Sequence, residues 1–192
     1  SQANATILLF KQGSNSPVWS YELEERMVCL SISASGNYIT TVSSGSGVDD
    51  NKLYLFEKNS STPLWIYNNT GTYRTLYSCD ISENGEYLVA GDNNKLYLFS
   101  KNSNTPLWTK TLGQRVDKLS ISANGENIVC GDHNQNITLF SKDGNKLWTY
   151  KQEEENHMIG SLVISSDGKY VATGSHEGTQ NDNKIRFFHI DN

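Results

Sequence analysis

The chain has 192 residues, of which 36% are hydrophobic and 19% charged, and its formal net charge is −5. This composition is typical of a folded protein with a polar surface. Lys and Arg form no basic run, so nucleic-acid binding is not expected, and no apolar stretch approaches the length of a membrane span. Asn, Ser, Thr and Gly dominate the polar residues, and no window has an apolar period near 3.6 residues, so we predict essentially no helix.

The first 23 residues contain two short strands that resemble the end of a repeat. One is apolar and aromatic, Ile7-Leu8-Leu9-Phe10, and the other carries Val18-Trp19. The next unit, 27–67, has the same two strands after two others. Its four predicted strands are, in order, Leu30–Ser33, Tyr38–Thr40, Leu53–Phe56 and Leu64–Trp65.

Two further units, 75–112 and 116–151, repeat all four strands, and a last partial unit, 159–190, repeats the first three. The third strand begins at residues 7, 53, 96, 137 and 185, so its copies lie 41 to 48 residues apart. This is about the length of a four-stranded propeller blade. Each first strand is followed by a glycine at a fixed offset: Gly36, Gly85, Gly125 and Gly168.

The four tryptophans of the chain all occupy the fourth strand of the repeat: Trp19, Trp65, Trp108 and Trp148. Short strands at even spacing with one aromatic per repeat are typical of a propeller. We therefore predict a single all-β domain, a β-propeller of about four four-stranded antiparallel blades. The repetition of Trp at one strand position favours packing between blades over stacking on a sugar or a quinone.

The repeat, which reads Ile-Ser, Gly, Tyr-Leu-Val-Ala-Gly, Leu-Tyr-Leu-Phe and Leu-Trp in the unit 75–112, resembles those of prokaryotic propellers described as WD-like or as pyrroloquinoline-quinone-like. The Leu-Trp pair is similar to the quinone-type repeat, in which the Trp docks between neighbouring blades. The turn after Ile-Ser is similar to the WD type, although the Gly-His and Trp-Asp signatures of that type are absent. The resemblance implies the fold; function has to be argued from a site.

The strand count leaves one copy of the third strand without a place in a four-bladed ring. The strand of Trp19 would join the C-terminal sheet if the ring closed within the chain, and the spare strand would be pushed aside. The alternative is an open arc, as part of a larger array or completed by another chain. We favour the open arc, because an unpaired edge strand is one that proteins tend to cover.

Two columns of polar residues are expected on the face that carries the loops after the second and fourth strands. Arg26, Arg74, Arg115 and His157 precede the first strands, and Asp49, Asp50, Asp92, Asp132 and Glu177 follow the second strands. The column of basic residues could capture a carboxylate or phosphate of a partner. The interpretation that we favour is that each Arg pairs with an Asp of a neighbouring loop and ties blades together.

Neither a metal nor a disulfide is expected. His133 and His176 lie one repeat apart beside Asp132 and Glu177, and loop histidines at such spacing are usually solvated. Cys29, Cys79 and Cys130 lie in predicted strands among apolar neighbours, where small buried thiols are common.

We predict a non-catalytic module for protein–protein interaction or scaffolding, with no cofactor. One alternative is a cell-surface component that closes its ring, or polymerises, through free blade edges as a homo-oligomer. Another is a fragment of a quinone-type propeller enzyme. Asn-Xaa-Ser/Thr triplets at Asn4, Asn59, Asn68 and Asn136 slightly favour the cell exterior, whereas the unpaired cysteines favour a reducing compartment.

Overall fold

The computed structural model describes residues 5–45, 51–70, 72, 75–152, 157–177 and 184–190. These residues form seventeen β-strands and no helix, which confirms the all-β prediction. None of the described segments is therefore a helix long and apolar enough to cross a membrane.

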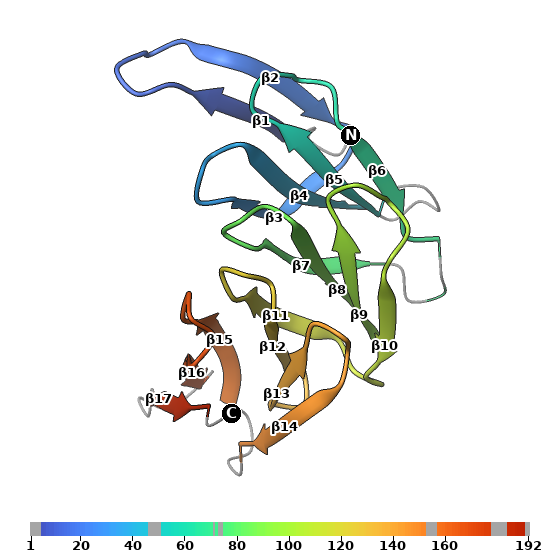
Figure 1. Cartoon of the computed structure of the whole chain (residues 1–192). Coiled ribbons are helices and arrows are strands. Elements are labelled where there is room, and N and C mark those ends of the chain that lie inside the picture. Colours follow the sequence, from blue (N-terminus) through green and yellow to red (C-terminus); the bar gives the residue numbers. More distant parts are fainter. Residues whose placement is uncertain are drawn as a thin grey trace.

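The strands form five antiparallel sheets in chain order, which we call blades 1 to 5 (Figure 1). Blade 1 contains β1 (Ala5–Phe10) and β2 (Pro17–Leu23), and blade 2 contains β3 (Arg26–Ile32), β4 (Tyr38–Ser44), β5 (Lys52–Glu57) and β6 (Trp65–Asn68). Blade 3 contains β7 (Leu76–Ile81), β8 (Tyr87–Asp92), β9 (Lys95–Ser100) and β10 (Trp108–Thr111). Blade 4 contains β11 (Val116–Ile121), β12 (Asn127–Asp132), β13 (Asn136–Ser141) and β14 (Lys146–Lys151), and blade 5 contains β15 (His157–Ile164), β16 (Tyr170–Glu177) and β17 (Lys184–His189).

Each complete blade is a meander in which consecutive strands pair, because the turns between them are short. In the hairpin between first and second strands, glycines with positive φ supply the left-handed position: Gly36 (φ 68°), Gly85 (75°), Gly125 (78°) and Gly168 (74°). The repeated Ser-x-x-Gly sequence thus predicts the turn, and the apolar alternation predicts the strands on either side.

The core consists of four apolar layers, each lying between two neighbouring blades. Phe56 and Leu23 meet between blades 1 and 2, and Leu55 and Leu88 between blades 2 and 3. Similar layers join blades 3 and 4, and blades 4 and 5. The first strands β3, β7, β11 and β15 contact one another in sequence, so the blades stack side by side along an arc.

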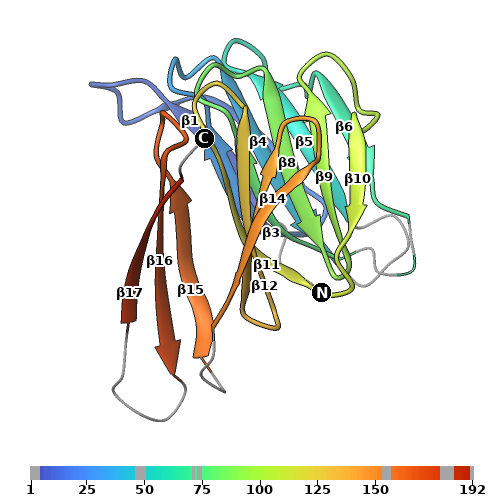
Figure 2. The same ribbon diagram turned by 60° about the horizontal axis from the view of Figure 1, so that its bottom comes forward.

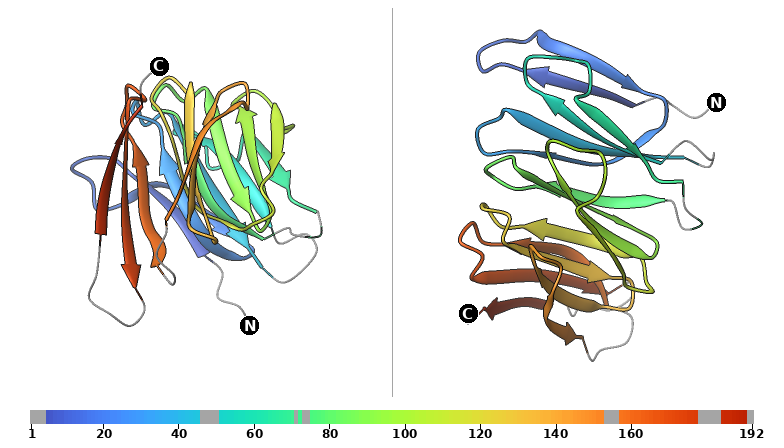
Figure 3. Two further views of the ribbon diagram at one scale, coloured as in Figure 1. Left: turned by 90° about the horizontal axis from the view of Figure 1, so that it is seen from below. Right: turned by 45° about the vertical axis from the view of Figure 1, so that its right-hand side comes forward.

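The arc is open. Figure 3 shows the blades stacked one after another, with the N- and C-terminal ends of the chain at opposite ends of the stack. β2 pairs with β1, and Figure 2 shows β17 at the outer edge of the last sheet. The strand of Trp19 does not join the C-terminal sheet, so the ring closed within the chain, one of our two alternatives, is not the arrangement in this structure.

Candidate functional site

A cluster of four polar and aromatic side chains lies where β11 begins, on the face that the sequence pointed to. The Arg115 guanidinium donates from Nε to Asp117 Oδ1, and its NH2 group lies 3.0 Å from His133 Nδ1. His133 Nδ1 also lies 3.0 Å from Asp117 Oδ2. Arg115 sits over the ring of Tyr77 in the preceding blade, 4.9 Å from its centroid. Asp117 raises the pKa of the Arg115 guanidinium, so the cation is held firmly.

This cluster, Tyr77, Arg115, Asp117 and His133, joins blades 3 and 4 and keeps part of its surface in solvent. The Arg115 side chain is 30% exposed and that of His133 50%. Asp117 satisfies one edge of the guanidinium. The imidazole and the outer part of the Arg115 side chain remain accessible to a partner.

Two aspartates predicted for the same face build turns, and one of them, Asp92, also accepts a hydrogen bond from the Asn69 side chain of the preceding blade at 3.0 Å. Asp92 is buried and accepts hydrogen bonds from the Tyr97 hydroxyl at 2.6 Å and from the backbone N–H groups of Asn94 and Lys95 at 2.7 and 2.6 Å. Asp132 accepts from the backbone N–H groups of Asn134 and Asn136, both at 2.9 Å. Arg115 pairs with Asp117 of its own strand, so our favoured pairing of Arg with an Asp of a neighbouring loop is wrong at this position.

The predicted basic column is also split by the strand register. The strand pairing aligns three residues of the repeat, Met27, Leu76 and Val116, which pair with Ser43, Asp92 and Asp132. Arg26 and Arg115 directly precede the aligned residue of their own blades, so they occupy the same repeat position. Arg74 is two residues before Leu76 in the sequence, one position earlier in the repeat. Arg26 is exposed at the start of β3. Arg74, together with Asp49 and Asp50, lies outside the described residues, as do the side chains of His157, His176 and Glu177.

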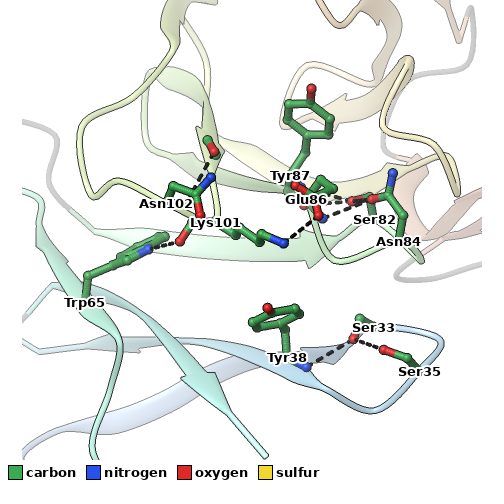
Figure 4. Close-up of polar contacts among 11 residues, drawn as sticks. Ser33, Ser35, Tyr38, Trp65, Ser82, Asn84, Glu86, Tyr87, Lys101 and Asn102 are labelled. Carbon is green, nitrogen blue, oxygen red and sulfur yellow. Dashed lines mark hydrogen bonds and ion pairs between the residues drawn. The ribbon is translucent and has the colours of Figure 1, made fainter.

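The tryptophans lie between the blades. Figure 4 shows the Trp65 indole reaching the backbone of the next blade, where its Nε1 donates to the Lys101 carbonyl at 2.7 Å. Trp19 and Trp108 make the same bond to Lys58 and Lys142, at 2.8 and 2.6 Å. Each ring also packs on the third strand of the next blade, and Trp148 does so on Phe188 with centroids 5.5 Å apart.

A second repeated contact closes the complete junctions on the side of the first hairpin. The Tyr38 ring packs on the Gly85 turn of the next blade, where an added Cβ would lie 2.6 Å from Tyr38 Cδ2. Lys101 of that blade lies over the same ring, 5.2 Å from its centroid, and its Nζ bonds Glu86 at 2.6 Å (Figure 4). Tyr87, Gly125 and Lys142 repeat the arrangement at the next junction. The Tyr–Gly–Lys contact is thus a recurring socket between blades.

Comparison with known proteins gives one family. The model described as outer membrane protein assembly factor BamB, a pyrroloquinoline-quinone-like repeat model, matches residues 49–185, more than half of the chain. The chain belongs to this family. As a member of the quinone-like repeat family, it has the Trp docking between blades that the sequence resemblance implied.

Solved structures agree on a β-propeller fold for this quinone-like repeat chain. The structure of U3-55K matches with a TM-score of 0.71 at 16% identity, over 87% of this chain and 50% of that one. Hydrazine synthase of Kuenenia stuttgartiensis matches with a TM-score of 0.69 at 10% identity, over 94% of this chain and 49% of that one. The chain therefore spans about half the length of these solved chains. No curated protein matches it in sequence.

Sequence reasoning missed Tyr77 and Asp117, although a signal was present. Asp117 follows Arg115 by two residues and lies at a register irregularity of β11, between Val116 and Lys118, where the strand has an extra residue. Tyr77 occupies the same repeat position as Asp117 in the preceding blade, and Val28 and Gly160 occupy it in blades 2 and 5. A position that changes from Val to Tyr, Asp and Gly between otherwise similar repeats stands out once the strand register is fixed.

Proposed function

We propose that this propeller is a non-catalytic module that binds a protein partner through the cluster of Tyr77, Arg115, Asp117 and His133. The observation that carries the proposal is the partly exposed Arg115 side chain, whose guanidinium is held between an aromatic ring and a carboxylate. Arg and Tyr are the residue types most enriched among interface anchors, because they combine a large contact surface with directed hydrogen bonds.

The geometry supports a preformed anchor. The ring of Tyr77 and the Asp117 carboxylate fix the guanidinium, so little side-chain entropy would be lost on binding. Asp92 and Asp132, two of the other charged groups predicted for this face, are engaged in hydrogen bonds within the chain. The description of the matching family model names an assembly factor, which agrees with a role in protein interactions.

The experiment is quantitative affinity capture from an extract of the source cells, with the immobilised wild-type chain and with Arg115→Gln combined with His133→Ala. We expect proteins retained by the wild type to be depleted at least about tenfold on the variant, because loss of an interface anchor typically costs about 2 kcal/mol. Lys146→Gln is the matched control, since Lys146 is exposed on β14 outside the cluster.

Equal retention on the wild type and the double variant, with unchanged circular dichroism, would overturn the proposal. A quinone absorption band in the purified chain would contradict its non-catalytic part and favour the quinone-type enzyme instead.

A further inference from the structure

The first junction of the arc lacks part of the cover that the other junctions have. Leu30 and Ile32 of β3 are 50% and 54% exposed, whereas Cys79 and Ile81, at the same positions of blade 3, are 5% and 4% exposed. In blade 3 these positions pack against the first strand of the preceding blade. Among the described residues blade 1 has only a third and a fourth strand, β1 and β2, and no described strand takes the place of a first strand in front of β3.

The space in front of β3 is hollow. One cavity of about 200 Å³ is lined by Leu8, Trp19, Leu30 and Ile32 among others, and a neighbouring hollow of about 560 Å³ is lined by Phe10, Ile32, Gly36 and Lys58 among others. Gly36 and Lys58 correspond to Gly85 and Lys101 of the filled socket in Figure 4. At Gly36 no atom lies within 4 Å of an added Cβ, so this socket has no tyrosine in it.

The other end of the arc presents the complementary surface. Tyr170 is the counterpart of Tyr38 and Tyr87, and it is exposed at the start of β16. Ile185 and Phe187 of β17 are each 78% exposed, whereas their counterparts Leu53 and Leu55 are fully buried. The apolar residues exposed on blade 5 also include Met158 and Val163 of its first strand, β15, which are 48% and 55% exposed.

We propose that the two ends join between two copies of this chain. The β15–β16 hairpin of one copy enters the hollow in front of β3 of the other and becomes the first and second strands of blade 1. The composite sheet then has the order β15, β16, β1, β2, with the last two strands from the other copy. Tyr170 fills the Gly36–Lys58 socket, and the first strand of the entering hairpin covers Leu30 and Ile32.

In this exchange β1 takes the place of β17 at the edge of β16. The two strands have matching sequences, Ile7-Leu8-Leu9-Phe10 and Ile185-Arg186-Phe187-Phe188, so the ladder lost with β17 is formed again with β1. Phe10, which is half-exposed at present, would take the position of Phe188 against Trp148. The copy of the third strand that the sequence left without a place in a ring is then β17, which is displaced from the edge of β16.

A second copy fits this role better than the chain's own hairpin. The two surfaces lie at opposite ends of the arc, so the hairpin cannot reach its own β1 (Figure 3). Head-to-tail contacts of this kind form a ring when the rotation between copies closes.

The first test is the molar mass of the full chain by light scattering across a concentration series. We expect a concentration-dependent species of twice the 21.5 kDa of one chain. Gly36→Ala should weaken it at least tenfold, because an added Cβ enters the space of the Tyr170 ring. Gly113→Ala is the matched control: its φ of 78° is similar to the 68° of Gly36, and an added Cβ also meets nothing within 4 Å.

The second test fixes the strand pairing. Thr173 pairs with Arg186 in β17, and Leu8 is the counterpart of Arg186 in β1. A mixture of Leu8→Cys chains and Thr173→Cys chains should form a mixed disulfide-linked dimer, and neither variant alone should form it to the same extent. Because two single variants are mixed, a bond within one chain cannot give this product.

A monomer at every concentration would overturn the proposal and point to further repeats of a longer polypeptide as the source of the missing strands. A dimer that Gly36→Ala leaves unchanged and that gives no mixed cross-link would also overturn it, since the contact would then lie elsewhere. Neither result bears on the Arg115 cluster, which lies between blades 3 and 4.

Discussion

At the scale of single residues, Asp80 connects the first strands of three blades. Its Oδ1 accepts a hydrogen bond from the Ser31 hydroxyl of blade 2 at 2.6 Å, and its Oδ2 accepts one from the Ile121 N–H of blade 4 at 3.1 Å. Burial between the blades raises the pKa of this carboxyl above its ordinary value of 3.8, although the hydrogen bonds act in the opposite direction. The equivalent positions of blades 2 and 4 hold serine, Ser31 and Ser120, which carries no charge.

Asp80→Ser is therefore expected to change how stability depends on pH. A raised pKa means that the folded state holds the proton more tightly than the unfolded state, so ionisation of Asp80 destabilises the fold at neutral pH. The loss of folding stability caused by the ionised carboxylate is complete above the raised pKa, and it disappears as the pH falls through that pKa towards 3.8. Thermal unfolding between about pH 7 and pH 4 should show the wild type gaining stability relative to Asp80→Ser on acidification. A wild type whose stability relative to Asp80→Ser stays constant or falls on acidification would contradict this assignment.

The polar residues of the candidate site were harder to predict than the apolar ones. Arg115 could be assigned to the correct face, because its place before a first strand fixes its end of the blade. The partners of Asp92 and Asp132 could not be read from spacing, since an aspartate at a strand end can bond its own turn as well as a neighbouring Arg. The structure shows that each carboxylate bonds its own turn, while the second oxygen of Asp92 accepts from Tyr97 and from Asn69 of the preceding blade.

At the scale of the strand, the fourth strand of each blade acts as a clasp on the next blade. In β10 the exposed positions are polar, Leu107 directly before the strand is also exposed, and Trp108 packs on the following blade. Trp108 packs on Phe140, with ring centroids 6.4 Å apart, and donates to the Lys142 carbonyl. One side chain thus supplies both an apolar contact and a hydrogen bond across the junction.

Trp108→Ala is expected to destabilise the chain by about 3–5 kcal/mol, as large-to-small changes of packed aromatic residues do. Trp108→Phe should cost less, because the ring contact remains and only the hydrogen bond, worth about 1 kcal/mol, is lost. Leu107→Ala, one residue earlier on an exposed position, should lie within about 0.5 kcal/mol of the wild type. Urea unfolding followed by circular dichroism measures all three, and equal costs for Trp108→Ala and Leu107→Ala would rule out the clasp.

The strands and turns themselves follow closely from the sequence, whereas the grouping of the end strands does not. Gly85 and Gly125 mark turns because only glycine adopts their positive φ without strain, and the continuous apolar run Leu96–Phe99 marks a buried strand. The partner of Trp19's strand depends on whether the two ends of the arc meet. That depends on small rotations between successive blades, which no local pattern encodes.

At the scale of the whole molecule, the arc behaves as a one-dimensional stack in its packing, because each apolar layer joins two neighbouring blades. A hydrogen bond from the Ser166 hydroxyl of blade 5 to the Glu83 carboxylate of blade 3 also reaches past blade 4. Blades 3 and 4 each lie between two other blades, and their inner strands β8 and β12 are buried apart from their first residues. Blade 1 has two strands and one neighbour, and β17 exposes alternate residues along its length. Stability should therefore fall from the centre of the stack towards both ends.

Hydrogen exchange followed by mass spectrometry tests this gradient on the dilute chain. We expect amides of β8, β9, β12 and β13 to exchange slowest, and those of β1, β2 and β17 to exchange faster by about tenfold or more, because local opening of an end sheet breaks only one apolar layer. The Gly36→Ala chain should show the same gradient, since its change lies outside every packed layer. If β1 is protected as strongly as β8 in both chains, the ends are not the weakest part of the stack. If only the wild type protects β1 as its concentration rises, the protection comes from the second copy, because strand exchange places β1 inside a composite sheet.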